Sequence, residues 1–299
     1  MRNYTCGLRR LYIAVRQCSK KVRIIVGLTS VALPLALTIP LALTTSVAKA
    51  NSATAISVKT NANKQQFIAQ RSDNAVIIDG IDDDPVWQNS NWYPINVPII
   101  NELPSKQDFS GEFALSWDQD YLYLLAKFQD DVLYDQHADP LYKYWDDDCL
   151  EVFIDEDKSG GNHQFNYNAF AYHVALDNQS VDIGESTEEG EANFVLLNDH
   201  VNSQWRRSSA QGNYIVWELA IKVFNDKFKL DTRSHDSREK LFSGKELGFM
   251  LAYCDNDGSA TRESFIGSTN IEAKNGDRNL GYITADVFSS LRLVDAKAK

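Results

Sequence analysis

From residue 75 onward, short runs of apolar and β-branched residues alternate with turn residues. Glu112–Trp117 alternates apolar and polar side chains, Asp118–Asp120 predicts a turn, and Tyr121–Phe128 predicts the second strand of a hairpin. Asp84 and Pro85 favour a short helical turn through Trp87, and no segment keeps a helical period beyond about three turns. The pattern predicts an all-β domain, a single β-sandwich with jelly-roll-like connections. Its other expected strands are Ala75–Asp79, Leu150–Asp155, Gln164–Ala171, Phe194–Leu197, Tyr214–Ile221 and Leu247–Cys254.

The beginning of the chain has the pattern of an export signal. Residues 1–23 are basic, Ile24–Ala48 carries no charged side chain, and Ala48-Lys49-Ala50 matches a signal-peptidase site. We therefore expect a signal peptide over residues 1–50 and a secreted or periplasmic protein starting at Asn51. An uncleaved membrane anchor is the alternative, because the uncharged stretch is long enough to span a bilayer. Residues 51–72, which lack any period, predict a flexible spacer, and residues 73–299 the sandwich.

The charge of the chain is unevenly distributed. The 299 residues carry a formal net charge of −11, but eight of the 30 basic residues lie in the expected signal. The remainder has 22 basic and 41 acidic side chains, a net charge of −19. Such a surface repels phosphate backbones and anionic lipid, which argues against nucleic acid and, after signal removal, against membranes. It suits neutral or cationic ligands and divalent metals.

Cysteine usage leaves two alternatives open. Cys6 and Cys18 leave with the expected signal, so Cys149 and Cys254 remain in an oxidising compartment, each at the end of an expected strand. They predict either a structural disulfide or two buried, unreactive thiols. Two cysteines with only five histidines in the chain argue against a structural zinc site.

An ordered series of motifs runs along the chain. The motifs are Ile78–Asp82, Asp84–Trp87, Leu115–Asp118, Tyr121–Tyr123, Trp145–Asp155, Gln164–Asn168, Trp217–Lys222 and Leu247–Ala252. In order and approximate spacing the series resembles the family 9 carbohydrate-binding modules, which belong to the DOMON-like sandwiches. The resemblance covers about residues 75–294 and implies a β-sandwich that binds the ends of sugar chains. Such modules are often attached to xylan- or cellulose-degrading enzymes, and calcium ions commonly help to hold them together.

The candidate sugar site begins with Trp145, in an aromatic loop followed by three aspartates. A neutral sugar needs an aromatic platform and planar hydrogen-bonding groups, so Trp145 is the expected platform, with a core position as the alternative. Glu151 shares a strand face with Cys149 and Phe153, and the resemblance implies that it accepts a sugar hydroxyl.

Three amides and a late aromatic residue complete the candidate site. Gln164, Asn166 and Asn168 share one face of their expected strand, which is either ligand-facing or simply solvent-facing. The resemblance implies an arginine where Asn166 stands and a second stacking tryptophan late in the chain, yet no tryptophan follows Trp217. Phe265 or Tyr282 can substitute for it, or the site is open or lost.

A calcium-like pattern follows the Glu151 strand. Asp155, Asp157 and Ser159 place oxygen ligands at alternate positions before Gly160, as in the start of a calcium loop. The twelfth position is Asn166, which excludes a helix–loop–helix site, and an ordinary strand turn is the alternative. We expect a structural calcium ion in so acidic a domain.

These features predict a non-catalytic, exported protein that binds neutral plant- or algal-type oligosaccharide or polysaccharide and supports carbohydrate catabolism. A glycoside hydrolase is the partner that the resemblance implies. The first alternative is that the chain is itself a glycoside hydrolase, which needs two carboxylates about 5 to 10 Å apart. A haem-binding electron-transfer sandwich is the second, but Met250, the one methionine after residue 50, fits a core position better.

Overall fold

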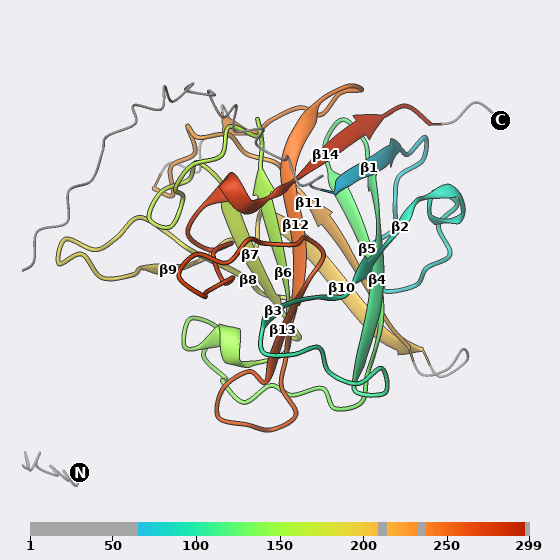
Figure 1. The fold of residues 1–299 in the computed structure, drawn as a ribbon. Helices are drawn as coiled ribbons and strands as arrows, with labels where there is room; N and C mark the ends of the chain where they lie inside the picture. Colours follow the sequence, from blue (N-terminus) through green and yellow to red (C-terminus); the bar gives the residue numbers. More distant parts are fainter. Residues whose placement is uncertain (1–64, 209–213, 232–236, 297–299) are drawn as a thin grey trace, which may run out of the picture. The chain divides into compact units, whose positions relative to one another are not determined.

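The computed structural model describes residues 65–208, 214–231 and 237–296, and these residues form an all-β domain (Figure 1). Its helical segments include the single turns η1 (Trp87–Asn89), η2 (Tyr144–Asp146) and η4 (Ala285–Val287). The predicted signal peptide and most of the predicted spacer lie outside the described residues. The strands are β1 (Gln66–Arg71), β2 (Trp92–Ile95), β3 (Val97–Ile100), β4 (Phe109–Trp117), β5 (Leu122–Asp130), β6 (Cys149–Asp155), β7 (Phe170–Ala175), β8 (Ser180–Ile183), β9 (Phe194–Leu196), β10 (Val201–Ser208), β11 (Tyr214–Ile221), β12 (Glu246–Asp255), β13 (Ser264–Gly267) and β14 (Ser289–Val294).

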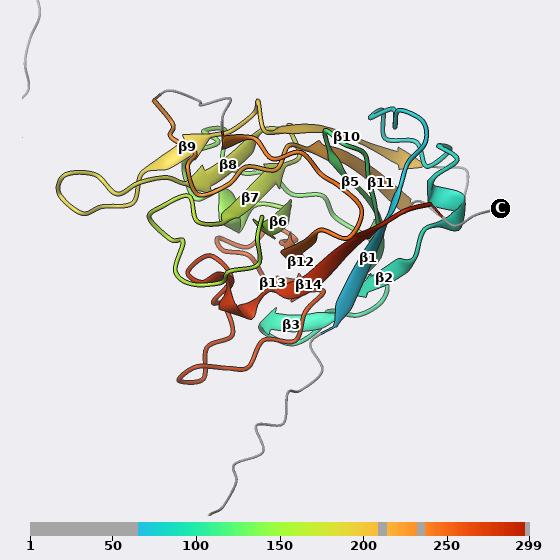
Figure 2. The same cartoon turned by 90° about the horizontal axis from the view of Figure 1, so that it is seen from above.

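The strands form two layers, as a β-sandwich requires. One layer has the order β10-β11-β5-β4 and the other the order β14-β12-β6-β7-β8-β9 (Figures 1 and 2). Strand β1 joins them, because it pairs in parallel with β4 on one side and with β14 on the other. At the open sides, β2 extends the first layer from β4, and β13 and β3 extend the second from β12.

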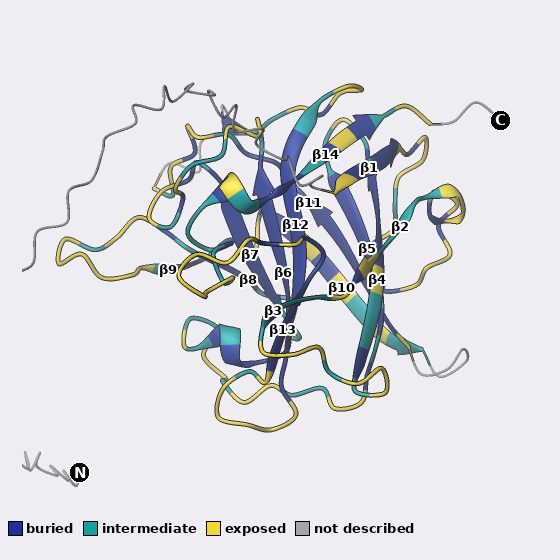
Figure 3. Ribbon diagram, in the orientation of Figure 1, coloured by how far each residue is buried: buried dark blue, intermediate teal, exposed yellow. Residues whose placement is uncertain are grey.

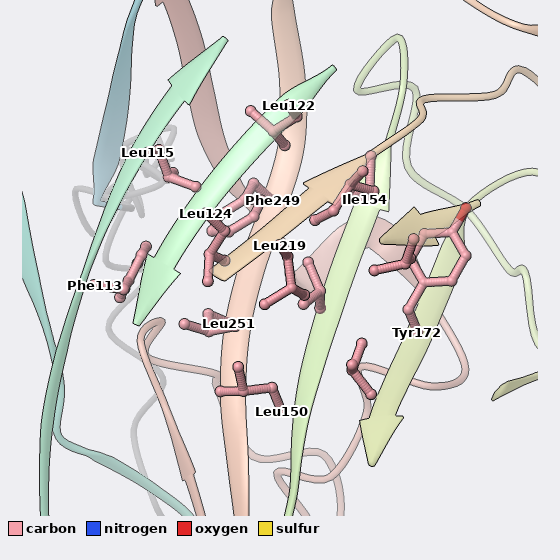
Figure 4. Close-up of a cluster of buried hydrophobic side chains, with 14 of the residues drawn as sticks. Phe113, Leu115, Leu122, Leu124, Leu150, Ile154, Tyr172, Leu219, Phe249 and Leu251 are labelled. Carbon is pink, nitrogen blue, oxygen red and sulfur yellow. The ribbon is translucent and has the colours of Figure 1, made fainter. Parts of the chain in front are cut away.

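The main core lies between the two layers. Figure 4 shows side chains from β4 and β5, such as Phe113 and Leu124, facing Leu150 of β6 and Leu251 of β12. All four are completely buried, which is the expected result of apolar positions alternating along each strand.

Strands β6 and β12 are also covered on their outer face, so they are buried along nearly their whole length (Figure 3). A second apolar cluster, built around Phe153, Met250 and Phe265, packs on that outer face. A third cluster, around Trp87, covers the outer face of the other layer.

Several predicted elements are confirmed and others are corrected. The β4–β5 hairpin and strands β6, β9, β11 and β12 lie where the alternation predicts them. The end of the predicted spacer, Gln66–Arg71, is instead strand β1. Ala75–Asp79 and Gln164–Asn168 are not strands, and the strand expected from Gln164 begins only at Phe170. Within the described residues, no helix has the length and apolar character needed to cross a bilayer.

A buried carboxylate, that of Glu218, holds the loop of residues 78–87 in place. Glu218 of β11 is completely buried, and its Oε2 accepts hydrogen bonds from the backbone N–H of Asp79 (3.1 Å) and Gly80 (3.0 Å). Its Oε1 accepts from Trp87 Nε1 at 3.2 Å. Gly80 has φ +76° and packs against the backbone of Trp205, so a side chain has no room there. Glu218 therefore ties this loop to the outer face of the first layer.

Glu218 predicts a pH dependence of stability. Burial raises its pKa to about 7 against the opposing effect of the three N–H donors, so the folded state holds a proton that the unfolded state releases near pH 4.5. The free energy of unfolding should therefore fall as pH rises from about 4.5 to about 7, by up to about 3 kcal/mol. Urea unfolding at each pH measures this, with Glu218→Gln as the control that cannot titrate. A constant difference between the two proteins across this pH range would contradict the prediction.

Candidate functional site

The candidate site lies on the outer face of strands β6, β7 and β12. Alternation along β6 places Cys149, Glu151 and Phe153 on this face, as predicted, while the residues between them enter the main core. Glu151 is only 2% exposed, and in register it lies between His173 of β7 and Ala252 of β12.

Glu151 and His173 form a buried ion pair. Glu151 Oε2 lies 3.2 Å from His173 Nε2, and His173 is 7% exposed. Burial alone would lower the pKa of His173, but the Glu151 carboxylate outweighs it and the pKa is raised. His173 thus provides a cationic group beside Glu151, in a chain that has asparagine at position 166 where the resemblance implies an arginine. The sequence contained no signal for it, because His173 reaches Glu151 only through the pairing of β6 with β7.

Three aromatic rings lie next to this pair. The Tyr144 ring meets His173 edge to face at a centroid distance of 4.5 Å, and Trp145 follows Tyr144 in η2 at 5.1 Å. Phe194, at the start of β9, lies 5.6 Å from Trp145 and 5.4 Å from Tyr144. Tyr144 is buried, whereas Trp145 and Phe194 are partly exposed. We call Trp145 and Phe194 the aromatic pair; Phe194 was not among the residues that the sequence predicted.

The three aspartates after Trp145 hold its loop in place. All are buried, and their carboxylates accept hydrogen bonds from backbone N–H groups of neighbouring loops. Asp147 Oδ1 accepts from Gln136 at 3.0 Å, and Asp148 Oδ2 accepts from Tyr134 at 2.7 Å. Burial, together with the carboxylate of Asp130, raises the pKa of Asp148 to about 9. The acidic run is therefore internal, and it orients the loop that carries Trp145.

The predicted row of amides lies in a loop. Asn166 Nδ2 donates to the backbone oxygen of Asn162 at 3.2 Å, and Asn166 Oδ1 accepts from the N–H of Asn168 at 2.8 Å. Asn168 Nδ2 donates to the Gly160 oxygen at 2.7 Å. Asn166 and Asn168 thus stabilise turns within the loop, and Gln164 is half-buried beside them.

The two aromatic residues considered as a second platform have different positions. Phe265 is 1% exposed in the outer cluster, beneath the guanidinium of Arg262 at 4.3 Å, so it is not a sugar platform. Tyr282 is half-buried in the segment 281–285, which runs alongside residues 161–163 through the bond from His163 N–H to the Ile283 oxygen. Its segment thus lies against the loop of the amides.

Cys149 and Cys254 lie directly opposite each other on β6 and β12, and both thiols are free in the structure. Arg262 Nη1 donates to Cys254 Sγ at 3.1 Å. Burial acts to raise the pKa of Cys254, but the hydrogen bond from Cys149 and the charge of Arg262 lower it below its ordinary value. The disulfide stays a prediction, and the register places the two residues where one can form.

The predicted calcium loop is a tight turn that follows β6, and calcium binding there stays a prediction. Asp155 Oδ2 accepts from Gly160 N–H at 2.8 Å, and Asp157 Oδ1 accepts from Ser159 N–H at 2.9 Å. Lys158 has φ +58° and Gly160 has φ +73°, as a tight turn requires. Asp155 Oδ2 and Asp157 Oδ1 are thus engaged by the backbone of their own turn, whereas Asp155 Oδ1 is buried without a hydrogen-bond partner among the described residues.

A denser group of carboxylates lies where strands of the two layers end. We call it the acidic cluster: Asp108 before β4, Asp130 and Asp131 at the end of β5, and Asp255 and Asp257 at the end of β12. Asp130, Asp255 and Asp257 offer oxygens that all lie within 4.8 Å of one another, as do Asp108, Asp131 and Asp257.

The acidic cluster is partly buried and short of hydrogen-bond donors. Asp130 is 1% exposed, and its Oδ1 has no hydrogen-bond partner among the described residues, although its Oδ2 accepts from Tyr253 at 2.6 Å. Burial and the neighbouring carboxylates, first among them Asp108, raise the pKa of Asp255 to about 8. A cation would supply the positive charge that these oxygens lack.

Two surface hollows of the described residues do not coincide with these groups. One of about 910 Å³ is lined by residues such as Ser72, Val86 and Asp295, and one of about 490 Å³ by Glu112, Lys127 and Tyr214 among others. Neither contains a predicted sugar-binding residue, and neither combines an exposed ring pair with a buried ion pair. The outer face of β6 and β7 is therefore the better candidate.

Comparison with known proteins identifies a family. Residues 78–296 match the family model described as "Carbohydrate family 9 binding domain-like". Over 91 residues, 30% of this chain, the sequence is 30% identical to endo-1,4-beta-xylanase A of Thermotoga maritima. The chain spans only 8% of the length of that enzyme.

Solved structures share the fold. A family 9 carbohydrate-binding module from Caldicellulosiruptor kristjanssonii in complex with glucose aligns with a TM-score of 0.54 at 17% identity, covering 79% of this chain and 98% of the module. The complex of a module from the same organism with cellotriose also aligns at 0.54, with 17% identity, over 78% of this chain and 95% of that one. At this level of identity the similarity establishes the sandwich fold.

Proposed function

This chain belongs to the carbohydrate family 9 binding domains, and from that membership we propose that it binds neutral oligosaccharide or polysaccharide of plant or algal type. The family comprises binding modules rather than catalytic domains. The observation that supports the site best is the partly exposed aromatic pair, which Tyr144 connects to the buried Glu151–His173 ion pair. The glucose and cellotriose complexes of the structural relatives agree with a sugar ligand.

The aromatic pair supplies a stacking surface. Sugar rings have apolar C–H faces, and the exposed parts of Trp145 and Phe194 offer apolar area from two elements, η2 and β9. The rings are tilted by 52° relative to each other, so we propose that a sugar lies against Trp145 with its edge against Phe194.

The Glu151–His173 ion pair supplies polar groups beneath the aromatic pair. Glu151 Oε2 has no hydrogen-bond partner among the described residues apart from the close contact with His173, so the carboxylate can still accept a bond. Tyr144 packs against His173, and we propose that its ring moves aside when a sugar hydroxyl reaches Glu151. While the Tyr144 ring stays in place, the ion pair acts by positioning Tyr144 and, through it, Trp145.

Export is a further part of the proposal. We propose that residues 1–50 direct the chain to the periplasm or the medium, where it supports carbohydrate catabolism alongside a glycoside hydrolase. N-terminal sequencing of protein recovered outside the cytoplasm should begin at Asn51. A chain that begins before Ile24 would instead indicate the uncleaved anchor.

Sugar binding is tested by isothermal titration of the full chain with glucose, cellotriose and xylotriose. Trp145→Ala should weaken binding about tenfold or more, since a lost stacking partner costs about 1 to 1.5 kcal/mol. Phe194→Ala should weaken it several-fold. Phe242→Ala is the matched control, because Phe242 is 59% exposed and belongs to neither group of residues. Equal affinities for Trp145→Ala and the wild type would show that the site is elsewhere.

We also propose that calcium occupies the acidic cluster rather than the Asp155–Ser159 turn. Carboxylate oxygens are the ligands that calcium prefers, and unpartnered, buried oxygens occur in both places, at Asp130 Oδ1 and Asp155 Oδ1. The acidic cluster is favoured because three carboxylates from the ends of different strands there offer oxygens within 4.8 Å of one another. The ion would hold the ends of β4, β5 and β12 together and so contribute to the stability of the sandwich.

Chelation tests the calcium proposal. EDTA should lower the melting temperature of the wild type by about 2 to 4 °C for each kcal/mol of binding energy lost, and added Ca²⁺ should restore it. Asp257→Asn should remove the part of this response that added Ca²⁺ restores, whereas Asp157→Asn should keep it. An unchanged melting temperature would refute calcium binding, and loss of the response in Asp157→Asn alone would assign calcium to the turn.

A further inference from the structure

Two thiols and an imidazole converge beside the candidate sugar site. Cys149 faces Cys254 across β6 and β12, and His173 faces Glu151 across β6 and β7. One ligand atom from each of Cys149, His173 and Cys254 lies within 4.8 Å of the other two. The three residues are 1%, 7% and 0% exposed, so the group is shielded from water.

One nitrogen of this group has no partner. Glu151 Oε2 engages His173 Nε2, which leaves Nδ1 as the nitrogen that can bind a ligand. His173 Nδ1 is buried and has no hydrogen-bond partner among the described residues. A buried polar atom without a partner costs free energy, which a bound metal ion would recover.

The surroundings resemble the outer sphere of a metal site. A histidine that binds a metal commonly donates its other N–H to a carboxylate, and Glu151 occupies that position for His173. Arg262 Nη1 donates to Cys254 Sγ at 3.1 Å, as donors to metal-bound thiolates do. The charges also balance, because two thiolates neutralise a divalent ion while Arg262 and Glu151 carry opposite charges.

We propose that Cys149, Cys254 and His173 bind one zinc ion. A ligand set of two cysteines and one histidine is known for zinc and leaves a fourth position for water or another ligand. Bond lengths of about 2.3 Å to sulfur and 2.0 Å to nitrogen place ligand atoms about 3.5 Å apart, and the three atoms here lie within 4.8 Å of one another. The ion would fix the edges of β6, β7 and β12 below Tyr144. The proposal does not depend on sugar binding.

The sequence argued against a structural zinc site because the expected mature chain offers only two cysteines and few histidines. The sheet removes this objection, since neighbouring strands bring ligands together across large sequence separations. Zinc binding and the predicted disulfide exclude each other, because two sulfurs joined in a disulfide cannot bind zinc as thiolates.

Cobalt is the spectroscopic probe for this site. The full chain with Cys6→Ser and Cys18→Ser keeps Cys149 and Cys254 as its only cysteines, so any thiolate signal comes from them. Titration of the metal-free, reduced protein with Co²⁺ should produce a sulfur-to-cobalt charge-transfer band that saturates at about one equivalent and that Zn²⁺ abolishes. His173→Gln should lose the band, and Glu151→Gln should weaken Co²⁺ affinity about 10- to 100-fold.

Controls separate this site from the others. Asp257→Asn and Trp145→Ala should keep the band, because they alter the acidic cluster and the aromatic pair respectively. The same Cys6→Ser/Cys18→Ser protein, purified and unfolded without reductant, should show two titratable thiols and about one equivalent of zinc by elemental analysis. Absence of a charge-transfer band, or a band that persists in Cys149→Ser/Cys254→Ser, would overturn the proposal. Zero free thiols would overturn it in favour of the disulfide.

Discussion

The structure depends on the burial of strands β6 and β12 on both faces. Their inner side chains fill the space between the two layers, and their outer side chains meet a second apolar cluster. A polar group on such a strand has no access to water, so it must find a partner within the protein. Glu151 pairs with His173, and Cys254 accepts a hydrogen bond from Arg262. The functional chemistry of the domain follows from this constraint.

The same constraint changes the meaning of the acidic composition. Many of the carboxylates are internal and hold loops by accepting backbone hydrogen bonds, as Glu218 does for residues 79–80 and Asp147 for residues 136–137. Others crowd together at the ends of β4, β5 and β12 without enough donors. Some of the carboxylates therefore stabilise loops and others form a candidate cation site, in addition to the effect of acidic residues at the surface.

The outer face of β6 and β7 combines two chemistries at different depths. Trp145 and Phe194 offer apolar rings at the surface, while Glu151, His173 and the two cysteines form a polar group beneath Tyr144. Any group that fixes His173 also fixes the Tyr144 ring that packs against it, so the aromatic rings rest on a rigid part of the sheet. A shallow aromatic surface on a rigid polar floor suits a binding module.

The sequence by itself determined the sandwich class, the β4–β5 hairpin, and the face of β6 to which Glu151 belongs, because alternation is a local property with a period of two residues. It misjudged Gln164–Asn168, whose polar alternation resembles a strand but serves turns, and it missed β1, whose partners β4 and β14 are far away in the chain. Only the tertiary structure placed His173 beside Glu151 and Phe194 beside Trp145. Strand pairing between distant segments decides such contacts, and no local pattern records which strands will be neighbours.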